Sequence, residues 1–222
     1  MPSTRKRTLI LPLNEFDRQI LPASVRGGKP AVRHDAMSTF LRQQFRRLGG
    51  TIQKIEYTAD EIQVTWIEDL TTADPINPII RMLTQGDLSE AVILMKLLLS
   101  DDPDNTNILY NLGMACSDMG ALDQAIRYLS HLEELEPEHV NGRVALGVAL
   151  TRQGDYERAV VELERAIQAD PSNPWAQRNL GACLGRLGRF EEAVDHLRLA
   201  TDLGLNEDRV WYDLGQALER TG

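Results

Sequence analysis

The chain has 222 residues, of which 42% are hydrophobic, 26% charged and 5% aromatic, and its formal net charge is −9. This composition is typical of a soluble globular protein, and no apolar run approaches the ~20 residues that a membrane-spanning helix needs. The two cysteines, Cys116 and Cys183, and the four histidines show no metal-ligand spacing. We therefore expect reduced core thiols, no metal and a cytoplasmic location.

The charge is divided unevenly along the chain. Residues 1–54 contain 11 Lys and Arg against 3 Asp and Glu, a net charge of +8. The remaining residues contain 13 against 30, a net charge of −17. Such asymmetry predicts two modules, and the acidic one is unsuited to broad nucleic-acid binding.

The first module, residues 1–70, is predicted to be a small α+β unit in the order β-α-β-β. Residues 7–13 predict a strand, and residues 21–33 an extended segment. Residues 35–48 carry apolar side chains at helical spacing and predict an amphipathic helix. Residues 51–68 predict a hairpin, because apolar and polar side chains alternate near its end and Thr58 to Asp60 suit a turn.

This first module is basic. Its positive residues outside the hairpin include Arg5, Lys6, Arg7, Arg26, Lys29, Arg33, Arg42, Arg46 and Arg47. A basic patch with Phe45 nearby suits binding of RNA, DNA or an anionic membrane surface. The other interpretation is a solvated helix face that is attracted to the acidic remainder of the chain.

The rest of the chain repeats with a period of 34 residues. A Leu-Gly pair recurs at residues 112–113, 146–147, 180–181 and 214–215. Further residues recur in other phases of the same period, namely Gly86, Gly120, Gly154, Gly188 and Gly222, Ala91, Ala125, Ala159 and Ala193, and Pro103, Pro137 and Pro171. We predict two helices per unit, for example Val140 to Gln153 and Tyr156 to Ala169, joined by a left-handed glycine. Each Leu-Gly glycine lies in the first helix of its pair. We expect its missing side chain to let the backbone of the second helix approach closely at Ala125, Ala159 or Ala193.

A 34-residue helix–turn–helix unit with this pattern resembles the tetratricopeptide repeat family. The resemblance covers residues 72–222 and divides them into units 72–105, which is divergent, 106–139, 140–173, 174–207 and a half unit 208–222. It implies an α-helical solenoid, a right-handed superhelix of helix pairs, beside the small N-terminal α+β module. The final helix is either a simple cap, part of a longer array, or a surface that pairs with another molecule.

The resemblance also implies which residues face the inner groove of the solenoid. They include Asn107, Tyr110, Asn111, Met114, Asp118, Asn141, Val144, Val148, Arg152, Trp175, Arg178, Asn179, Ala182, Arg186, Arg209, Tyr212, Asp213 and Arg220. The amides of Asn111 and Asn179 suit a peptide backbone. The arginines predict either a site for an acidic peptide segment or ordinary surface ion pairs, while the groove around Met114 is more apolar.

No catalytic motif is present in the sequence, so we expect no enzyme, no cofactor and no small-molecule substrate. We predict a non-catalytic protein–protein interaction scaffold that binds a peptide segment of a partner in the concave groove. One alternative is an adaptor whose basic module binds nucleic acid or an anionic surface while the repeats recruit a protein. Another is a structural subunit that self-assembles into homo-oligomers.

Overall fold

A computed structural model describes residues 4–12, 29–47, 50–69 and 76–222. The chain divides into two compact units, Met1–Pro103 and Asp104–Gly222. The module boundary predicted near residue 71 lies outside the described residues, and so does most of the extended segment predicted over residues 21–33.

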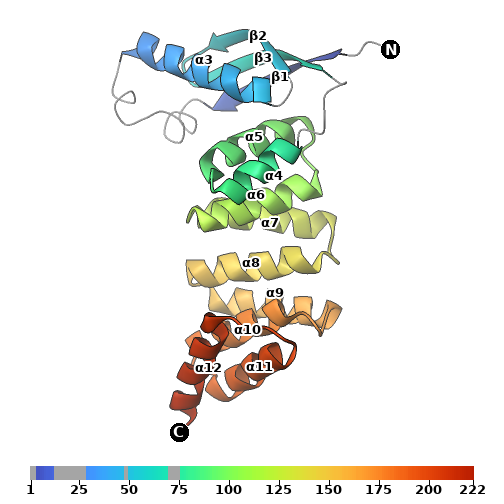
Figure 1. The fold of residues 1–222 in the computed structure, drawn as a ribbon, viewed down its shortest axis with the longest axis vertical. Helices are drawn as coiled ribbons and strands as arrows, with labels where there is room; N and C mark the ends of the chain where they lie inside the picture. Colours follow the sequence, from blue (N-terminus) through green and yellow to red (C-terminus); the bar gives the residue numbers. More distant parts are fainter. Residues whose placement is uncertain (1–3, 13–28, 48–49, 70–75) are drawn as a thin grey trace. The chain divides into compact units, whose positions relative to one another are not determined.

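The first unit contains a three-stranded antiparallel sheet of β1 (Thr4–Pro12), β2 (Gly50–Tyr57) and β3 (Glu61–Asp69), with β3 in the centre. The predicted hairpin is confirmed: its turn is closed by the Thr58 amide, which donates to the Glu61 carbonyl at 2.9 Å. Helix α3 (Pro30–Arg47) packs against β2 (Figure 1).

Helix α3 begins earlier than predicted. Residues 30–33 are helical instead of extended, because Pro30 occupies the first helical position, where its fixed φ is favourable and its missing N–H costs nothing. From there Met37, Leu41 and Phe45 form one buried stripe against the sheet.

The core of this unit lies between α3 and the sheet. Ile62, Val64 and Trp66 alternate with more exposed residues along β3, as predicted, and Trp66 meets Phe45 edge to face at a ring-centroid distance of 4.8 Å. Phe45 is only 1% exposed, so it cannot contribute to the nucleic-acid surface that the neighbouring basic residues suggested. Its ring is used in the core and is not available to stack on a base.

The divergent unit 72–105 also forms a helix pair, α4 (Ile76–Gln85) and α5 (Leu88–Asp101). The turn between them passes through Gly86, whose φ of +84° is costly for any residue with a Cβ. The apolar run Ala91 to Met95 in α5 is buried throughout.

The second unit is a stack of helix pairs. The helices are α6 (Thr106–Asp118), α7 (Leu122–Leu135), α8 (Val140–Gln153), α9 (Tyr156–Ala169), α10 (Pro174–Arg186), α11 (Phe190–Asp202) and α12 (Asp208–Thr221). Each packs against the next along the chain, as Figure 1 shows. The bounds predicted for α8 and α9 are confirmed.

The Leu-Gly glycines lie nearest to a leucine of the second helix, and the predicted alanine backbone comes close at Gly181, where the carbonyl oxygen of Ala193 would lie 3.0 Å from a Cβ. A Cβ at Gly147 would lie 2.6 Å from Cγ of Leu163, and a Cβ at Gly181 would lie 2.6 Å from Cγ of Leu197. Gly113 meets Leu129 in the same way. At Gly113 and Gly147 the nearest atoms belong to the leucine one turn after the predicted alanine, because that leucine projects into the space above the glycine.

A buried polar contact joins α10 to α11. His196 Nδ1 lies 2.7 Å from Oε1 of Gln177, which is 2% exposed. Burial lowers the pKa of His196, although the carboxylates of Asp195, Glu164 and Glu192 oppose the shift. The folded chain therefore favours neutral His196, whereas the unfolded chain takes up a proton at an ordinary histidine pKa.

The stability of the α10–α11 pair is therefore expected to depend on pH. A lowered folded pKa makes the contribution of His196 complete above about pH 6.5 and reduces it as the pH falls further. Urea unfolding of the wild type and of His196→Gln from about pH 7.5 to about pH 5 tests this, because the variant should lose less stability on acidification. Equal losses in the two proteins would contradict the assignment.

Candidate functional site

A cavity opens where α6, α8 and α10 of three successive units meet. It has a volume of about 310 Å³, and we call it the Met114 cavity. Its lining residues are Tyr110, Met114, Asn141, Val144, Ala145, Val148, Asn173, Trp175 and Asn179. All but Ala145 and Asn173 are among the residues predicted to face the groove.

Of the two lining residues that were not predicted from the sequence, Ala145 is buried in α8 and Asn173 has a local role. Asn173 caps α10, because its Oδ1 accepts a hydrogen bond from the Ala176 amide at 3.0 Å. Asn105 caps α6 in the same phase of the repeat. That recurrence of a capping residue before the first helix is the signal that would have found Asn173.

The wall of the Met114 cavity is mainly apolar. Val144 and Val148 are half-buried, while Met114 and Trp175 remain 38% and 54% exposed. The Tyr110 ring lies 5.4 Å from the ring of His139, and burial raises the pKa of the Tyr110 hydroxyl. The phenol is therefore neutral at physiological pH and can donate a hydrogen bond.

The predicted asparagines differ in their availability. Asn179 lines the cavity, and its Oδ1 accepts a hydrogen bond from Nη1 of Arg178 at 3.0 Å. Asn111 does not line it; its Nδ2 donates to the backbone carbonyl of Asn107, one turn earlier, at 2.7 Å. Asn141 is exposed at the cavity, so among the predicted asparagines Asn141 and Asn179 border it.

Two of the five arginines predicted to face the groove contact acidic groups of their own chain. Arg178 Nη2 lies 3.5 Å from Oδ2 of Asp213, and the two side chains are 12% and 19% exposed. Arg152 Nη1 donates to Ser117 Oγ at 3.1 Å and lies 3.6 Å from Oδ1 of Asp118. Their positive charge is thus partly neutralised within the repeat array.

The other predicted residues lie farther along the array. Arg186 lines a second cavity of about 460 Å³ between α10 and α12, together with acidic and basic residues of α12. Arg209 is exposed, and its charge adds to burial in lowering the pKa of Arg178. Tyr212 is 63% exposed, and its hydroxyl accepts a hydrogen bond from Gln216 Nε2 at 2.8 Å.

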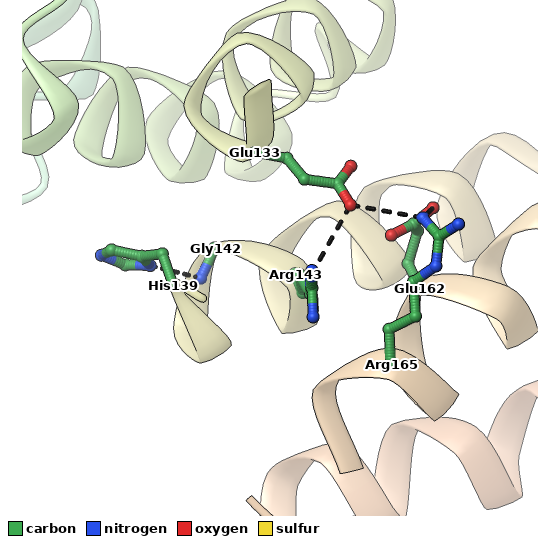
Figure 2. Close-up of polar contacts among 6 residues, drawn as sticks. All are labelled: Glu133, His139, Gly142, Arg143, Glu162 and Arg165. Carbon is green, nitrogen blue, oxygen red and sulfur yellow. Dashed lines mark hydrogen bonds and ion pairs between the residues drawn. The ribbon is translucent and has the colours of Figure 1, made fainter. Parts of the chain in front are cut away.

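A cluster of four charged residues joins α7, α8 and α9 away from both cavities (Figure 2). Glu133 Oε1 lies 3.6 Å from Arg143 Nε and 3.4 Å from Arg165 Nη1, and Arg165 also pairs with Glu162 at 3.3 Å. Burial raises the pKa of Glu162, and the neighbouring Glu133 carboxylate adds to the shift. Two guanidinium groups face two carboxyl groups here, so the cluster links neighbouring units.

The structure also limits other classes of site. Within the ranges described above, no group of three or more His, Cys, Asp or Glu side chains is arranged to hold a metal ion. No helix in those ranges is long and apolar enough to cross a membrane.

Comparison with known proteins identifies the repeats. Two family models described as tetratricopeptide repeat match residues 110–174 and residues 150–221. The comparison with curated proteins gave no match.

Several solved structures share the fold. One titled MamA AMB-1 is 29% identical, with a TM-score of 0.55 over 66% of this chain and 80% of that one. MamA from Desulfovibrio magneticus RS-1 is 22% identical, with a TM-score of 0.56 over 66% and 88%. TTC0263, a thermophilic TPR protein of Thermus thermophilus, is 19% identical, with a TM-score of 0.58 over 67% and 81%.

The family matches lie in the helix stack. Neither family model matches residues before 110. The stack and the family pattern share helix pairs that repeat every 34 residues with a Leu-Gly pair in the first helix. Through residues 110–221, this chain belongs to the tetratricopeptide repeat family.

Proposed function

We propose that the chain is a non-catalytic scaffold whose Met114 cavity holds a peptide segment of a partner protein. The observation that carries this proposal is the convergence of Met114, Val144, Val148 and Trp175, from three successive units, around one cavity. A cavity of about 310 Å³ is large enough for a bulky apolar side chain. The amides of Asn141 and Asn179 at its border can pair with the peptide backbone on either side.

The chemistry of the lining supports binding without catalysis. It consists of apolar side chains, amides and one phenol whose pKa is raised by burial. None of these groups exchanges a proton readily near neutral pH, so the cavity offers no general acid or base. The cytoplasmic location stays a prediction, and Cys116 and Cys183, which are buried and free, are compatible with it.

An apolar ligand is better supported than an acidic one. Arg178 and Arg152 contact Asp213, Ser117 and Asp118 of the chain itself. An acidic peptide would have to compete with these contacts. The acidic partner suggested by the sequence stays a prediction that the described contacts do not favour.

Replacing Met114 by glutamate is expected to abolish most of the binding. Peptides selected from a random library on the immobilised chain should carry a bulky apolar residue. Their affinity for Met114→Glu should fall at least about tenfold, because a carboxylate is costly in an apolar cavity. Fluorescence anisotropy with labelled peptides measures the loss.

Met119→Glu is the matched control. Met119 is 40% exposed, close to the 38% of Met114, and it does not line the cavity. Its replacement should leave peptide affinity unchanged, and circular dichroism should show both variants folded. Equal peptide affinities of the two variants would show that the peptide binds outside the Met114 cavity. A selection that enriches no peptide would overturn the proposal of peptide binding.

A further inference from the structure

The Met114 cavity has a floor and two side walls. Helix α8 contacts both α6 and α10, and it lies between them along the stack (Figure 1). The short side chains of α8 form the floor, namely Val144, Ala145 and Val148. Tyr110 comes from α6 and Trp175 comes from α10, so each side wall of the cavity contains an aromatic ring.

The Tyr110 wall is supported by the residue that caps α8. The ring of His139 lies 5.4 Å from the ring of Tyr110 and is not part of the cavity lining. His139 is itself held, because its Nδ1 accepts a hydrogen bond from the Gly142 amide at 2.8 Å (Figure 2). The units before and after carry asparagine caps in this phase, Asn105 and Asn173, which have no ring. Tyr110 is thus supported before a ligand binds, which lowers the entropic cost of binding.

Trp175 forms the opposite wall and remains 54% exposed. The equivalent positions in the other units are Asn107, Asn141 and Arg209, so the packing of the repeat does not require an indole ring here. Pro174 begins α10, and Trp175 follows it in the first helical turn. An exposed tryptophan beside an apolar cavity is typical of a binding surface, because it would otherwise leave a large apolar area in water.

The charges around the cavity select an uncharged ligand. All of the residues that line it are neutral. Arg152 and Arg178, which lie on α8 and α10, contact Asp118 and Asp213 of the chain itself. A charged side chain inside the cavity would therefore lose its hydration without gaining an opposing charge.

We propose that the Met114 cavity binds an aromatic side chain from an uncharged segment of the partner protein, between the rings of Tyr110 and Trp175. This inference rests on the proposed function and specifies the residue that enters the cavity. The two rings can pack on a third ring edge to face or offset, and the Met114 thioether can contact its edge. A leucine side chain would bury apolar area but would make none of these ring contacts.

Polar groups at the border of the cavity are available to the backbone of the same segment. In the ranges that the structure describes, Nε1 of Trp175, the hydroxyl of Tyr110 and the amide of Asn141 form no hydrogen bond within the chain. By contrast, Nε1 of Trp211 donates to Oδ1 of Asn206 at 2.9 Å. The three unpaired groups can donate to peptide carbonyls on either side of the aromatic residue.

The first test compares peptide selection on two full-length proteins. A random peptide library selected on the wild type should be enriched in peptides with Phe, Tyr or Trp and no charged neighbour. Selection on Trp175→Leu should lose the aromatic preference, because the variant keeps an apolar wall without a ring. Trp211→Leu is the control, since Trp211 is 49% exposed and lies outside the lining, and it should keep the preference.

The second test measures the preference with a single selected peptide. Replacing its aromatic residue by leucine should weaken binding to the wild type at least about fivefold in fluorescence anisotropy, because the ring contacts are lost. The same replacement should have little effect on binding to Trp175→Leu. In a chain labelled with ¹³C at the methionine methyl groups, the ring current of the bound aromatic residue should shift the Met114 resonance. The Met119 resonance, from outside the lining, should not move.

The outcomes separate this inference from the proposed function. Peptides that bind wild type but not Met114→Glu, and that bind equally well with leucine in place of the aromatic residue, would overturn the aromatic preference and leave peptide binding intact. A Met114 resonance that the aromatic peptide does not move would also overturn the inference. A selection that enriches no peptide would overturn peptide binding itself, and with it a partner's side chain as the occupant.

Discussion

Gly147→Ala is expected to lower the free energy of unfolding by about 1–3 kcal/mol, even though alanine is the better helix former. The added Cβ would lie 2.6 Å from Cγ and 2.9 Å from Cδ2 of Leu163. Cγ is the branch point of that side chain, which is 0% exposed and has little room to move. The α8–α9 pair must therefore separate or Leu163 must leave its rotamer. Urea unfolding followed by circular dichroism measures the loss.

Gly215→Ala is the matched control and should have the opposite sign. The two glycines occupy the same phase of the repeat, but no atom lies within 4 Å of a Cβ at Gly215. The substitution should therefore stabilise the chain by up to about 1 kcal/mol through helix propensity alone. If both alanines stabilised, close packing would not be the reason for the recurring glycine.

Asp213→Ala is expected to destabilise the chain by about 3 kcal/mol, by removing the partner of a largely buried charge. Arg178 is 12% exposed, and Asp213 supplies the opposing charge from the next unit. Burial already lowers the pKa of Arg178, and the charge of Arg209 lowers it further. Without Asp213 the guanidinium group remains buried beside a second positive charge.

A second substitution distinguishes two causes of the lost stability, namely the unpaired charge of Arg178 and a general loss of packing. Arg178→Met in the Asp213→Ala background removes the charge but keeps an apolar stem, so it should recover most of the lost stability. Glu192→Ala breaks an ion pair on the surface, with Arg189, and should change stability little. Unaltered stability of Asp213→Ala would show that the Arg178–Asp213 pair contributes nothing.

Elements with strong local signals could be predicted closely. The bounds of α8 follow from apolar spacing that ends at a left-handed glycine, Gly154 at φ +93°, and those of α9 from its cap Asp155 and the Asp170-Pro171 pair that ends it. The start of α3 was misplaced because Pro30 suits both an extended segment and a first helical turn. The packing of Met37 and Leu41 on the sheet is what favours the helical conformation at Pro30 over the extended one.

The candidate site also has a part that the sequence predicts and a part that it does not. The phase of the repeat predicted most of the residues around the Met114 cavity, because equivalent positions of stacked units face the same side. The phase did not predict that Asn111 hydrogen-bonds to Asn107, or that Arg178 reaches Asp213 35 residues away. The first contact depends on the rotamer that Asn111 adopts within α6, and the second on how α10 and α12 lie beside each other.

The period, the helix pairs and the family follow from the order of the amino acids, because each signal is local and recurs every 34 residues. The tertiary structure decided what each equivalent position contacts. Gly147 and Gly215 share one phase, yet a leucine covers the first and the structure leaves the second open. Trp211 and Gln177 likewise share a phase but differ in exposure. The physical reason is that side-chain burial depends on the neighbouring helix, which a periodic pattern does not specify.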